Sequence, residues 1–413
     1  MESAPTEVTM ANTPTLRFGE FDGEWSEKRY GDIYSFYTTN SYSRDNLNYE
    51  KGTVRNIHYG DIHTKFSTMF HLENEKVPFI NEDIELNKIK DESYCQVGDL
   101  VIADASEDYA DIGKTMEIMS LNNEKTLSGL HTFLARPNKY DMALGYTGYL
   151  LQSWKIRKQV MRIAQGTKVL SLSTKRLADV VLHIPTKPEQ QKIAIFLSAI
   201  DSSIEQLSKK EQLLRSYKKG VMQKIFSREI RFTRDDGGAF EDWVEKRLGD
   251  IFKISAGGDI DKDNVSSEKD SIFKYPIFSN SDKNAGLYGY SNTAKIEENC
   301  LTVSGRGTLG IAIERKESFF PIVRLLVLVG KEKVNYKFFE NAINSLNFFV
   351  ESTGVPQLTA PQISIYKVTY PSLPEQTKIA NFLSSLDKQI AQVSEQLAEK
   401  KDFKKGLLQK MFV

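Results

Sequence analysis

Two long segments of the chain carry hydrophobic residues at alternating steps of four and three. This spacing gathers the apolar side chains into one stripe along an α-helix. Each segment begins with Pro followed by Glu, which suits a first helical turn, and neither contains an internal proline. The pattern predicts two helices, each roughly 57 Å long. The stripe residues are Ile193, Leu197, Ile200, Ile204, Leu207, Leu214, Val221 and Ile225, then Ile379, Leu383, Leu386, Ile390, Val393, Leu397, Leu407 and Met411.

The two segments are copies of one another. Residues 188–226 align with residues 374–412 without a gap, and 19 of the 39 positions are identical. A second repeated motif, WSEKRYGDI from Trp25 and WVEKRLGDI from Trp243, stands ahead of each long variable stretch. The chain therefore contains an internal repeat, in which a variable block followed by a long helix occurs twice.

Two arrangements of the helices are open. They either pack as a pair inside one globular core or form an exposed coiled coil, which the sustained heptads and their charged positions favour. The second variable block leaves the end of the first helix, and the second helix begins where that block ends. Paired helices must then run antiparallel, with one globular block at each end of a rod and an approximate twofold axis.

The variable blocks mix two kinds of pattern. DLVIAD and RLLVLVG are strand-like, whereas YKFFENAINSLNFFVEST is helical. We therefore predict the α/β (α+β) class, with two globular mixed domains joined by two long antiparallel coiled-coil helices. The predicted bounds are a tail at 1–14, a first domain at 15–185, a first helix at 186–229, a second domain at 230–371 and a second helix at 372–413.

Composition narrows the class of protein. With 413 residues and 40% hydrophobic content, the chain is long enough for two or three domains. Cys95 and Cys300 lie far apart, which argues against a disulfide framework or structural zinc. The start has neither a basic nor an apolar signal region, and no apolar run reaches a membrane-spanning length. We expect a soluble, cytoplasmic protein whose zero net charge leaves room for a local basic face.

The repeated motifs resemble a known family. PxxPEQxKIAxFLxxxD begins at Pro185 and again at Pro371, each copy closes on KKGxxQKxF, and each variable block follows the tryptophan-led motif. This architecture resembles the specificity subunit of type I restriction-modification systems over essentially the whole chain.

The resemblance implies a non-catalytic DNA-recognition subunit. Each variable block would be a target recognition domain for one half of a split DNA sequence. The paired helices would set the gap and dock two adenine methyltransferase subunits, and a restriction and translocase subunit with endonuclease activity can join. S-adenosylmethionine, ATP and Mg would be bound by those partners, and this chain would hold no cofactor or metal. The helix residues expected to contribute are Pro188, Glu189, Gln190, Phe196, Lys218 and Lys219, with Pro374, Glu375, Gln376, Phe382, Lys404 and Lys405 in the second copy.

Two stretches of the first block are candidates for double-stranded DNA. Residues 155–175 carry six cations and no acid, which suits phosphate contact as well as an ordinary basic helix face. Residues 42–66 mix cations, histidines and tyrosines with glycines, a composition suited to base-edge hydrogen bonds. The candidates are Tyr42, Arg44, Arg55, His58, Tyr59 and His63, with Lys155, Arg157, Lys158 and Arg162.

The second block offers FSNSDKNAGLYGYS and VSGRGTLG. Their glycines allow close approach of the backbone, and Arg306 is the preferred base or phosphate contact. A tight hairpin with a solvated arginine is the alternative. The candidates here are Lys283, Tyr288, Tyr290, Arg306 and Thr308.

Two rival functions stay open at this point. GRGTLG has the letters of a dinucleotide-binding motif, but the strand-like sequence after it does not supply the helix that motif needs. IGKT at Ile112 ends like a P-loop, but Asp108 stands where its first glycine is required. No catalytic motif or histidine spacing suited to a metal is visible. A coiled-coil scaffold without a DNA role is the other rival.

Overall fold

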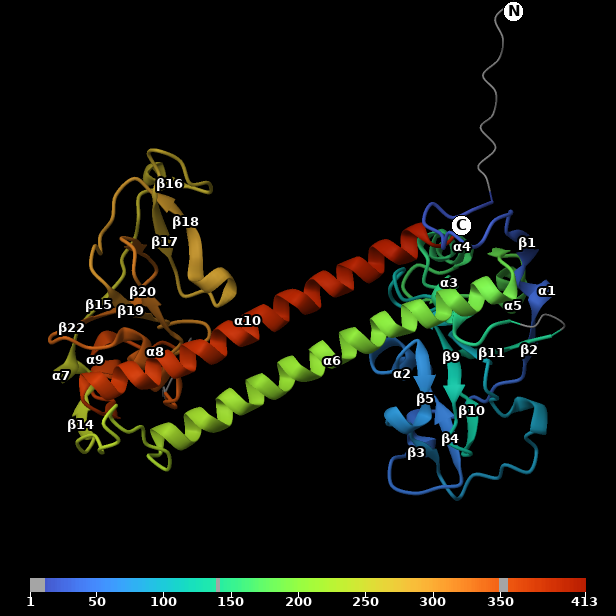
Figure 1. The fold of residues 1–413 in the computed structure, drawn as a ribbon, viewed down its shortest axis with the longest axis horizontal. Coiled ribbons are helices and arrows are strands. Elements are labelled where there is room, and N and C mark those ends of the chain that lie inside the picture. Colours follow the sequence, from blue (N-terminus) through green and yellow to red (C-terminus); the bar gives the residue numbers. More distant parts are fainter. Residues whose placement is uncertain (1–11, 139–141, 349–355) are drawn as a thin grey trace, which may run out of the picture. The chain divides into compact units, whose positions relative to one another are not determined.

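The computed structural model describes residues 12–138, 142–348 and 356–413, and it contains two compact units. The first unit comprises the chain up to Leu207 together with Gln396–Val413, and the second comprises Ser208–Glu395. Both divisions fall inside the long helices α6 (Lys187–Phe226) and α10 (Leu373–Lys410), so each unit owns part of both helices (Figure 1). The fold is mixed α/β, as predicted.

The first unit is built on two sheets. In the larger sheet β11 is antiparallel to both of its neighbours, and in the smaller sheet β10 runs parallel to β4. The larger sheet has the order β2 (Tyr34–Tyr37), β11 (Thr132–Pro137), β7 (Leu100–Ala103), β9 (Thr115–Ser120), β5 (Met69–His71). The smaller has the order β10 (Lys125–Ser128), β4 (Val54–Ile57), β6 (Phe79–Ile80), β3 (Leu47–Asn48).

The second unit repeats this topology. β22 is antiparallel to both of its neighbours, and β21 runs parallel to β17. The sheets have the orders β15 (Phe252–Ala256), β22 (Leu326–Gly330), β19 (Cys300–Val303), β20 (Ala312–Arg315) and β21 (Phe320–Pro321), β17 (Tyr275–Phe278), β18 (Leu287–Ser291), β16 (Val265–Ser266). Among the described residues, β5 has no counterpart in these sheets. The variable blocks have thus diverged in sequence while keeping one strand connectivity.

Shorter elements complete each unit. The first holds β8 (Ala105–Ser106), β12 (Leu170–Ser171), α2 (Tyr59–Thr64), α3 (Tyr146–Leu150), α4 (Trp154–Ile163) and α5 (Thr174–Ala178). The second holds α8 (Tyr336–Asn344) and α9 (Ala360–Ser364). The stretches DLVIAD and RLLVLVG contain β7 and β22 as predicted, and YKFFENAINSLNFFVEST begins with α8, while its residues 349–353 lie outside the described part.

The tryptophan-led motif folds the same way twice. β1 (Ser26–Arg29) pairs with β13 (Val181–Ile184), and β14 (Val244–Arg247) pairs with β23 (Lys367–Tyr370), both antiparallel. A short helix follows each first strand, α1 (Tyr30–Ile33) or α7 (Leu248–Ile251). The Asp32 and Asp250 carboxylates accept hydrogen bonds from the backbone N–H groups just ahead of those helices. The motif therefore pairs the start of each variable block with the strand at its end, just ahead of the long helix.

The long helices run antiparallel within each unit. In the first unit Ile193 and Leu197 of α6 share a buried core with Leu407 and Met411 of α10. In the second unit Ile225 of α6 is buried with the start of α10. Ile390, Val393 and Leu397 are also buried, although they lie outside the domain cores. The coiled-coil prediction is confirmed, with the addition that the helix ends belong to the cores of the domains.

Two predictions concern the bounds of the chain's parts. The predicted tail at 1–14 falls largely on residues 1–11, which the structure does not describe. The predicted domain bounds stay a prediction. Among the described helices, none combines the length and apolar character that a membrane crossing requires.

Candidate nucleic-acid interface

A bidentate ion pair with a buried carboxylate, which we call a clamp, holds each domain to the first turn of its own helix. Arg17 binds the carboxylate of Glu189 at 2.7 Å through both Nε and a terminal nitrogen. Arg231 binds Glu375 in the same way, at 3.1 and 2.9 Å. The two carboxylates are 1% and 0% exposed. Bidentate pairing of this kind fixes direction as well as distance, so it orients each domain on the first turn of its helix.

The neighbouring motif residues complete these clamps. The amide of Gln190 donates to the Pro185 carbonyl and accepts from Ala143 N–H, and Gln376 makes the equivalent bonds to Pro371 and Asn335. Phe196 and Phe382 pack edge-on against Phe18 and Phe232. These residues are engaged with their own domain, and their contact with a partner stays a prediction. The residues concerned are Glu189, Gln190, Phe196, Glu375, Gln376 and Phe382.

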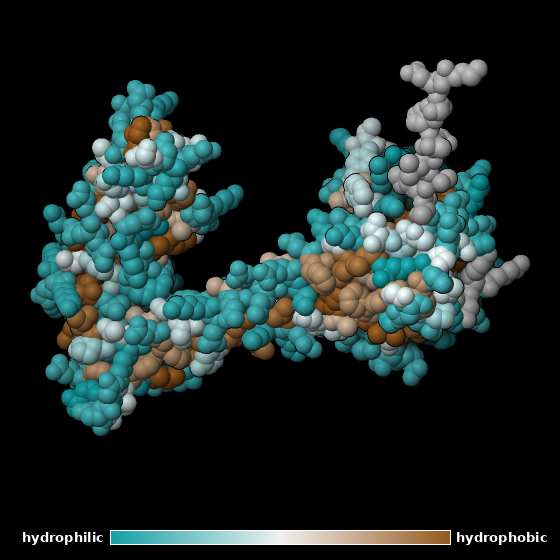
Figure 2. All heavy atoms as spheres, turned by 45° about the horizontal axis from the view of Figure 1, so that its top comes forward, coloured by the Kyte–Doolittle hydropathy of each residue, from teal (hydrophilic) through white to brown (hydrophobic). Residues whose placement is uncertain are grey.

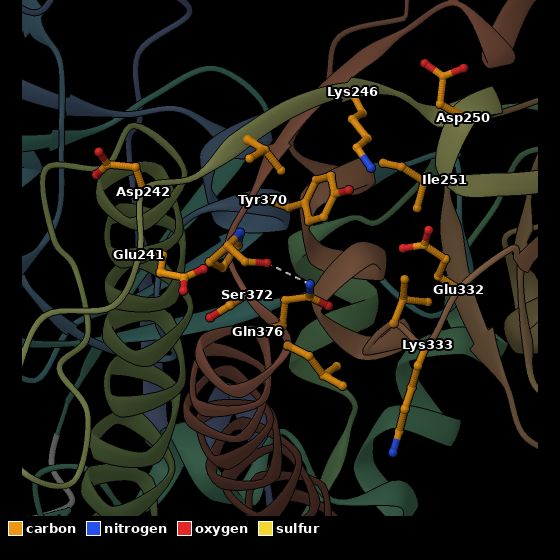
Figure 3. Close-up of a pocket in the computed structure, with 14 residues that line it drawn as sticks. Glu241, Asp242, Lys246, Asp250, Ile251, Glu332, Lys333, Tyr370, Ser372 and Gln376 are labelled. Carbon is orange, nitrogen blue, oxygen red and sulfur yellow. Dashed lines mark hydrogen bonds between the residues drawn. The ribbon is translucent and has the colours of Figure 1, made fainter.

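Figure 3 shows Gln376, the residue after Glu375 of the second clamp, at the edge of a cavity of about 250 Å³. Gln376 from α10 reaches the Pro371 carbonyl, while Lys246, Glu332 and Tyr370 come from the surrounding strands and loops. Acids and lysines face this cavity together, and nowhere in the described chain do three or more His, Cys, Asp or Glu residues gather as metal ligands would. The cavity therefore belongs to the contact between the second domain and the start of α10.

Other predicted helix residues divide into two groups. Lys218 pairs with Asp387 across the helices in the second unit, and Lys404 pairs with Asp201 at 2.6 Å in the first. Lys219 and Lys405, and Pro188 and Pro374, are exposed.

Tyr217 and Phe403, which the sequence analysis missed, occupy the same place in the two copies and are 54% and 53% exposed. Hydrophobic residues lie on the visible surface of the long helices in Figure 2. The free surface of the helices is thus partly apolar and partly basic.

The basic helix of the first unit is α4. Lys155, Lys158 and Arg162 are exposed on it, whereas Arg157 is directed inward. The Arg157 guanidinium donates to the carbonyls of Ile112 and Ala110 at 2.6 and 3.1 Å, and burial lowers its pKa. Three of these four cations are therefore open to a phosphate, and Arg157 instead supports the loop after β8.

Several candidates between Tyr42 and Phe66 are engaged within the fold. Arg55 stacks over Phe79 and pairs with Glu124 at 2.7 Å. His58 is buried, accepts a hydrogen bond from Gly60 N–H, and has its pKa lowered to about 4 chiefly by burial. Both side chains are held by partners within the fold, which the composition of this stretch did not indicate, and their contact with DNA stays a prediction.

Arg44 and Tyr42 are also held. The Arg44 guanidinium lies 2.6 Å from the fully buried carboxylate of Asp61, and half-buried Tyr42 packs beside Leu127 and other members of a small core. Desolvation acts to raise the pKa of Asp61, but hydrogen bonds from Arg44 and Lys65 outweigh it and leave the pKa lowered. Arg44 keeps a partly exposed face beside Gly60.

Three segments of the first unit converge at the ends of its strands, and we call them the first loop cluster: residues 58–63, 104–106 and 129–131. The Tyr59 ring meets the rings of His58, His63 and His131 at 4.8 to 5.9 Å. His63 bonds the Ala105 carbonyl at 2.9 Å. Nδ1 of His131 lies 3.3 Å from the Asp104 carboxylate. Burial raises the pKa of Asp104. His131 is half-exposed and was not among the predicted residues.

The second loop cluster comprises residues 279–286, 304–310 and 322–324. The Asn280 amide ties its three segments together, because it donates to the Val323 carbonyl at 2.6 Å and accepts from Gly305 N–H at 2.8 Å. Arg306 donates to the Gln357 side chain at 3.2 Å, and the Thr308 hydroxyl donates to Asp282. Lys283 is exposed within the cluster. Arg324, also exposed, is a cation that the sequence analysis missed.

A buried arginine supports the second loop cluster from below. Arg315 is 6% exposed, stacks 3.6 Å over Phe278, and donates to the Ala285 carbonyl at 2.7 Å. Burial lowers its pKa to about 10. Tyr288 and Tyr290 lie on β18, with Tyr288 62% exposed, so they belong to a strand rather than to this cluster.

The two nucleotide-like motifs lack the required framework. GRGTLG forms the turn between β19 and β20, so its third glycine is followed by a strand and not by a helix. A side chain at Gly310 would collide with Phe348 at 2.2 Å. IGKT likewise leads into β9. Gly113 packs against Val160 and Leu172. Both motifs are turns of a sheet. Cys95 and Cys300 are buried free thiols whose pKa burial raises.

Comparison with known proteins gives one consistent family. The model of the "Type I restriction modification DNA specificity domain" matches residues 23–215 and 240–400. A type I specificity subunit of Mycoplasma pneumoniae is 35% identical over 216 residues, which is 52% of this chain and 57% of that protein. The MjaX specificity subunit of Methanocaldococcus jannaschii is 25% identical over 402 residues, covering 91% and 90% of the two chains.

Solved structures share the fold. The S subunit of a type I restriction-modification system from M. genitalium superposes with a TM-score of 0.61 at 15% identity, covering 97% of this chain and 99% of that one. A chain from a structure on complex assembly and conformational transition of the type I system superposes with a TM-score of 0.54 at 15% identity, covering 93% and 96%.

Proposed function

This chain belongs to the type I restriction modification DNA specificity family, and from that premise we propose that each of its domains reads one half of a split DNA target. The family supplies the non-catalytic DNA-recognition subunit of type I restriction-modification systems. Such subunits bind DNA and assemble with other subunits of the system.

One observation carries the proposal. Two domains with the same strand connectivity are attached to the same helix motif by the same Arg–Glu clamp, yet their loop clusters differ in chemistry. The first cluster presents imidazole and phenol groups, and the second presents guanidinium and amide groups. A shared frame with different donors is what reading two unlike half-sites requires, because base edges are distinguished by their pattern of donors and acceptors.

The helices support a fixed gap between the half-sites. α6 has 40 residues and α10 has 38, and at 1.5 Å per residue each is about 60 Å long. Continuous hydrogen-bonded helices are stiff, and buried Ile390, Val393 and Leu397 stabilise the central part of α10. The basic surface of α4 would add phosphate contacts in the first domain, which position the chain without reading sequence.

Two adenine methyltransferase subunits are the proposed partners on the helices, and restriction and translocase subunits complete the assembly. The repeated exposed surface beside Tyr217 and Phe403, with Lys219 and Lys405, offers equivalent docking positions in the two copies. Exposed aromatics near cations are common anchors in protein interfaces. S-adenosylmethionine, ATP and Mg would belong to these partners.

Methylation mapping tests the proposal directly. The full chain is expressed with its cognate methyltransferase subunits in a host without adenine methylation, and N6-methyladenine is mapped by long-read sequencing. We expect one split motif with two defined halves and a constant gap, absent when this chain is omitted. Methylation that is independent of the chain, or a continuous motif without a gap, would contradict the proposal.

A further inference from the structure

The two loop clusters can be aligned residue by residue from the hydrogen bonds around them. Ser128 pairs with Ile57 across parallel strands, and Pro321 pairs with Phe278 in the same way. The next residue of each chain segment, Gly129 or Ile322, donates its N–H to the Ile57 or Phe278 carbonyl at 2.9 Å.

The alignment continues through the following residues. The Leu130 carbonyl accepts from the backbone of Tyr59, and the Val323 carbonyl accepts from the side chain of Asn280. One step further, His131 is matched with Arg324. The two side chains therefore hold the same place in the two domains, although one is an imidazole and the other a guanidinium.

This place is conformationally unusual in both domains. His131 has φ of 54° and Arg324 has φ of 61°, and Val323 before Arg324 has φ of 53°. Left-handed backbone destabilises non-glycine residues by about 1 to 2 kcal/mol, and a β-branched residue there is a clear outlier. Such strain persists when surrounding contacts enforce it, and it gathers at functional sites. Here neighbouring loops enforce it, since Val323 and Arg324 N–H bond the carbonyls of Gly258 and Gly257.

Both side chains are open to a ligand beside other polar groups. His131 is half-exposed between the Asp104 carboxylate and the ring of Tyr59. Arg324 is exposed next to the turn that carries Arg306, and its carbonyl lies 3.3 Å from the position a Cβ of Gly305 would take. Among the described contacts, no carboxylate pairs with Arg324, which leaves its five donors for an outside acceptor.

We propose that His131 and Arg324 are matched specificity-determining residues, each contacting base edges of one half-site. This rests on the proposed function and adds to it the positions that discriminate. Arginine binds the O6 and N7 acceptors of guanine in a bidentate manner, the commonest specific contact in the major groove. The half-site read by the second domain should therefore contain a guanine that depends on Arg324. The first half-site should depend on His131.

Glycine substitutions separate the effect of the side chain from that of the backbone conformation. Arg324→Gly and His131→Gly remove the proposed reading groups and relieve the left-handed strain, so both variants should fold. Arg228→Gly is the matched control: it removes an exposed arginine with φ of 66° outside the loop clusters of the same unit. Asn123→Gly, at φ of 59°, serves the first unit in the same way. Arg324→Lys keeps the charge but loses the planar fork.

The variants are tested as complete complexes by the methylation mapping described above. Arg324→Gly should relax one base position in one half of the motif by about tenfold or more and leave the other half intact. His131→Gly should change the opposite half only. The controls should retain both halves, and Arg324→Lys should keep methylation while relaxing the same position. An unchanged motif in Arg324→Gly and His131→Gly overturns the inference, whereas a wild type without any split motif overturns the proposed function itself.

If a variant complex loses all methylation, its DNA binding is measured instead. The purified complex competes for duplexes in which one half-site or the other is scrambled. A reading role predicts that Arg324→Gly no longer distinguishes an intact from a scrambled half on its own side, while it still distinguishes the other half. Undiminished discrimination on both sides overturns the assignment.

Discussion

The Arg231–Glu375 clamp gives the sharpest test of how a domain is fixed to its helix. Replacing Arg231 by Ala leaves the Glu375 carboxylate, 0% exposed, without its partner, and releases the carbonyls of Glu241 and Phe240 that the same guanidinium binds. Removing one member of a buried ion pair destabilises a protein by roughly 3 to 5 kcal/mol. Arg231 is itself 28% exposed, so water reaches the vacated site and we expect a smaller loss, about 2 to 3 kcal/mol.

Hydrogen exchange locates this loss. A change of about 2 to 3 kcal/mol corresponds to roughly 30- to 150-fold weaker protection, which should appear in peptides covering Ile379–Leu386 and the strands packed on them. Peptides of the first unit, clamped by Arg17 and Glu189, should not change. In thermal unfolding the second unit should melt about 4 to 12 °C lower.

Two variants make the reasoning refutable. Arg234→Ala removes an arginine of the same segment whose ion pair with Asp236 is exposed on both sides, so it should destabilise by less than about 1 kcal/mol. Adding Glu375→Gln to Arg231→Ala should recover part of the loss, because the uncompensated charge is gone. If Arg231→Ala is no worse than Arg234→Ala, the clamp does not hold the domain.

Three further outcomes are expected. Burial raises the pKa of Glu117 to about 7, above its ordinary 4.5, so the folded first unit binds the proton more tightly than the unfolded chain does. The contribution of this carboxyl to stability should therefore fall as pH rises from about 5 to 8, by up to about 3 kcal/mol. Buried His58, whose pKa is lowered to about 4, acts in the opposite sense below about pH 6.5, so the measured quantity is the difference in melting temperature between the wild type and Glu117→Gln, which should shift against the wild type as pH rises. Inserting four residues near Lys210, with a matching insertion in α10, lengthens the pair by about 6 Å, and the mapped gap should widen; an unchanged gap refutes the spacer role. Tyr217→Ser with Phe403→Ser should leave melting unchanged and reduce co-purification of the methyltransferase subunits, and full retention refutes docking at that surface.

The helical part of the fold was predictable because the hydrophobic stripe of a helix is local in the sequence and occurs in two copies. The stripe from Ile379 to Met411 is buried as the heptads require, and the repeated motif at Trp25 and Trp243 forms the same strand and helix in both units. The helix motif matches at an offset of 186 residues and the tryptophan motif at 218. Their different offsets show that the block between them had changed in length. No pattern indicated that its strand connectivity had been kept.

The site was less predictable, because composition does not show where a side chain points. Arg55, His58 and Arg157 stand in suitably polar stretches, but each finds an internal partner in the folded chain. His131 and Arg324 carry no sequence signal, since their left-handed conformation is imposed by loops that are distant along the chain. Only the strand register places them at one position.

The distribution of repeated and diverged residues has a physical consequence for changing specificity. The clamp residues and helix stripe must fit one another, because each buries charge or apolar surface that a substitution would expose. At positions 131 and 324 the loop clusters hold the chain through backbone hydrogen bonds, which any residue supplies, and both side chains are exposed. Substitutions there alter the donors offered to DNA with little effect on the core. A chain that needs new half-sites therefore has most freedom at positions such as 131 and 324, where the frame holds the backbone and leaves the side chain unspecified.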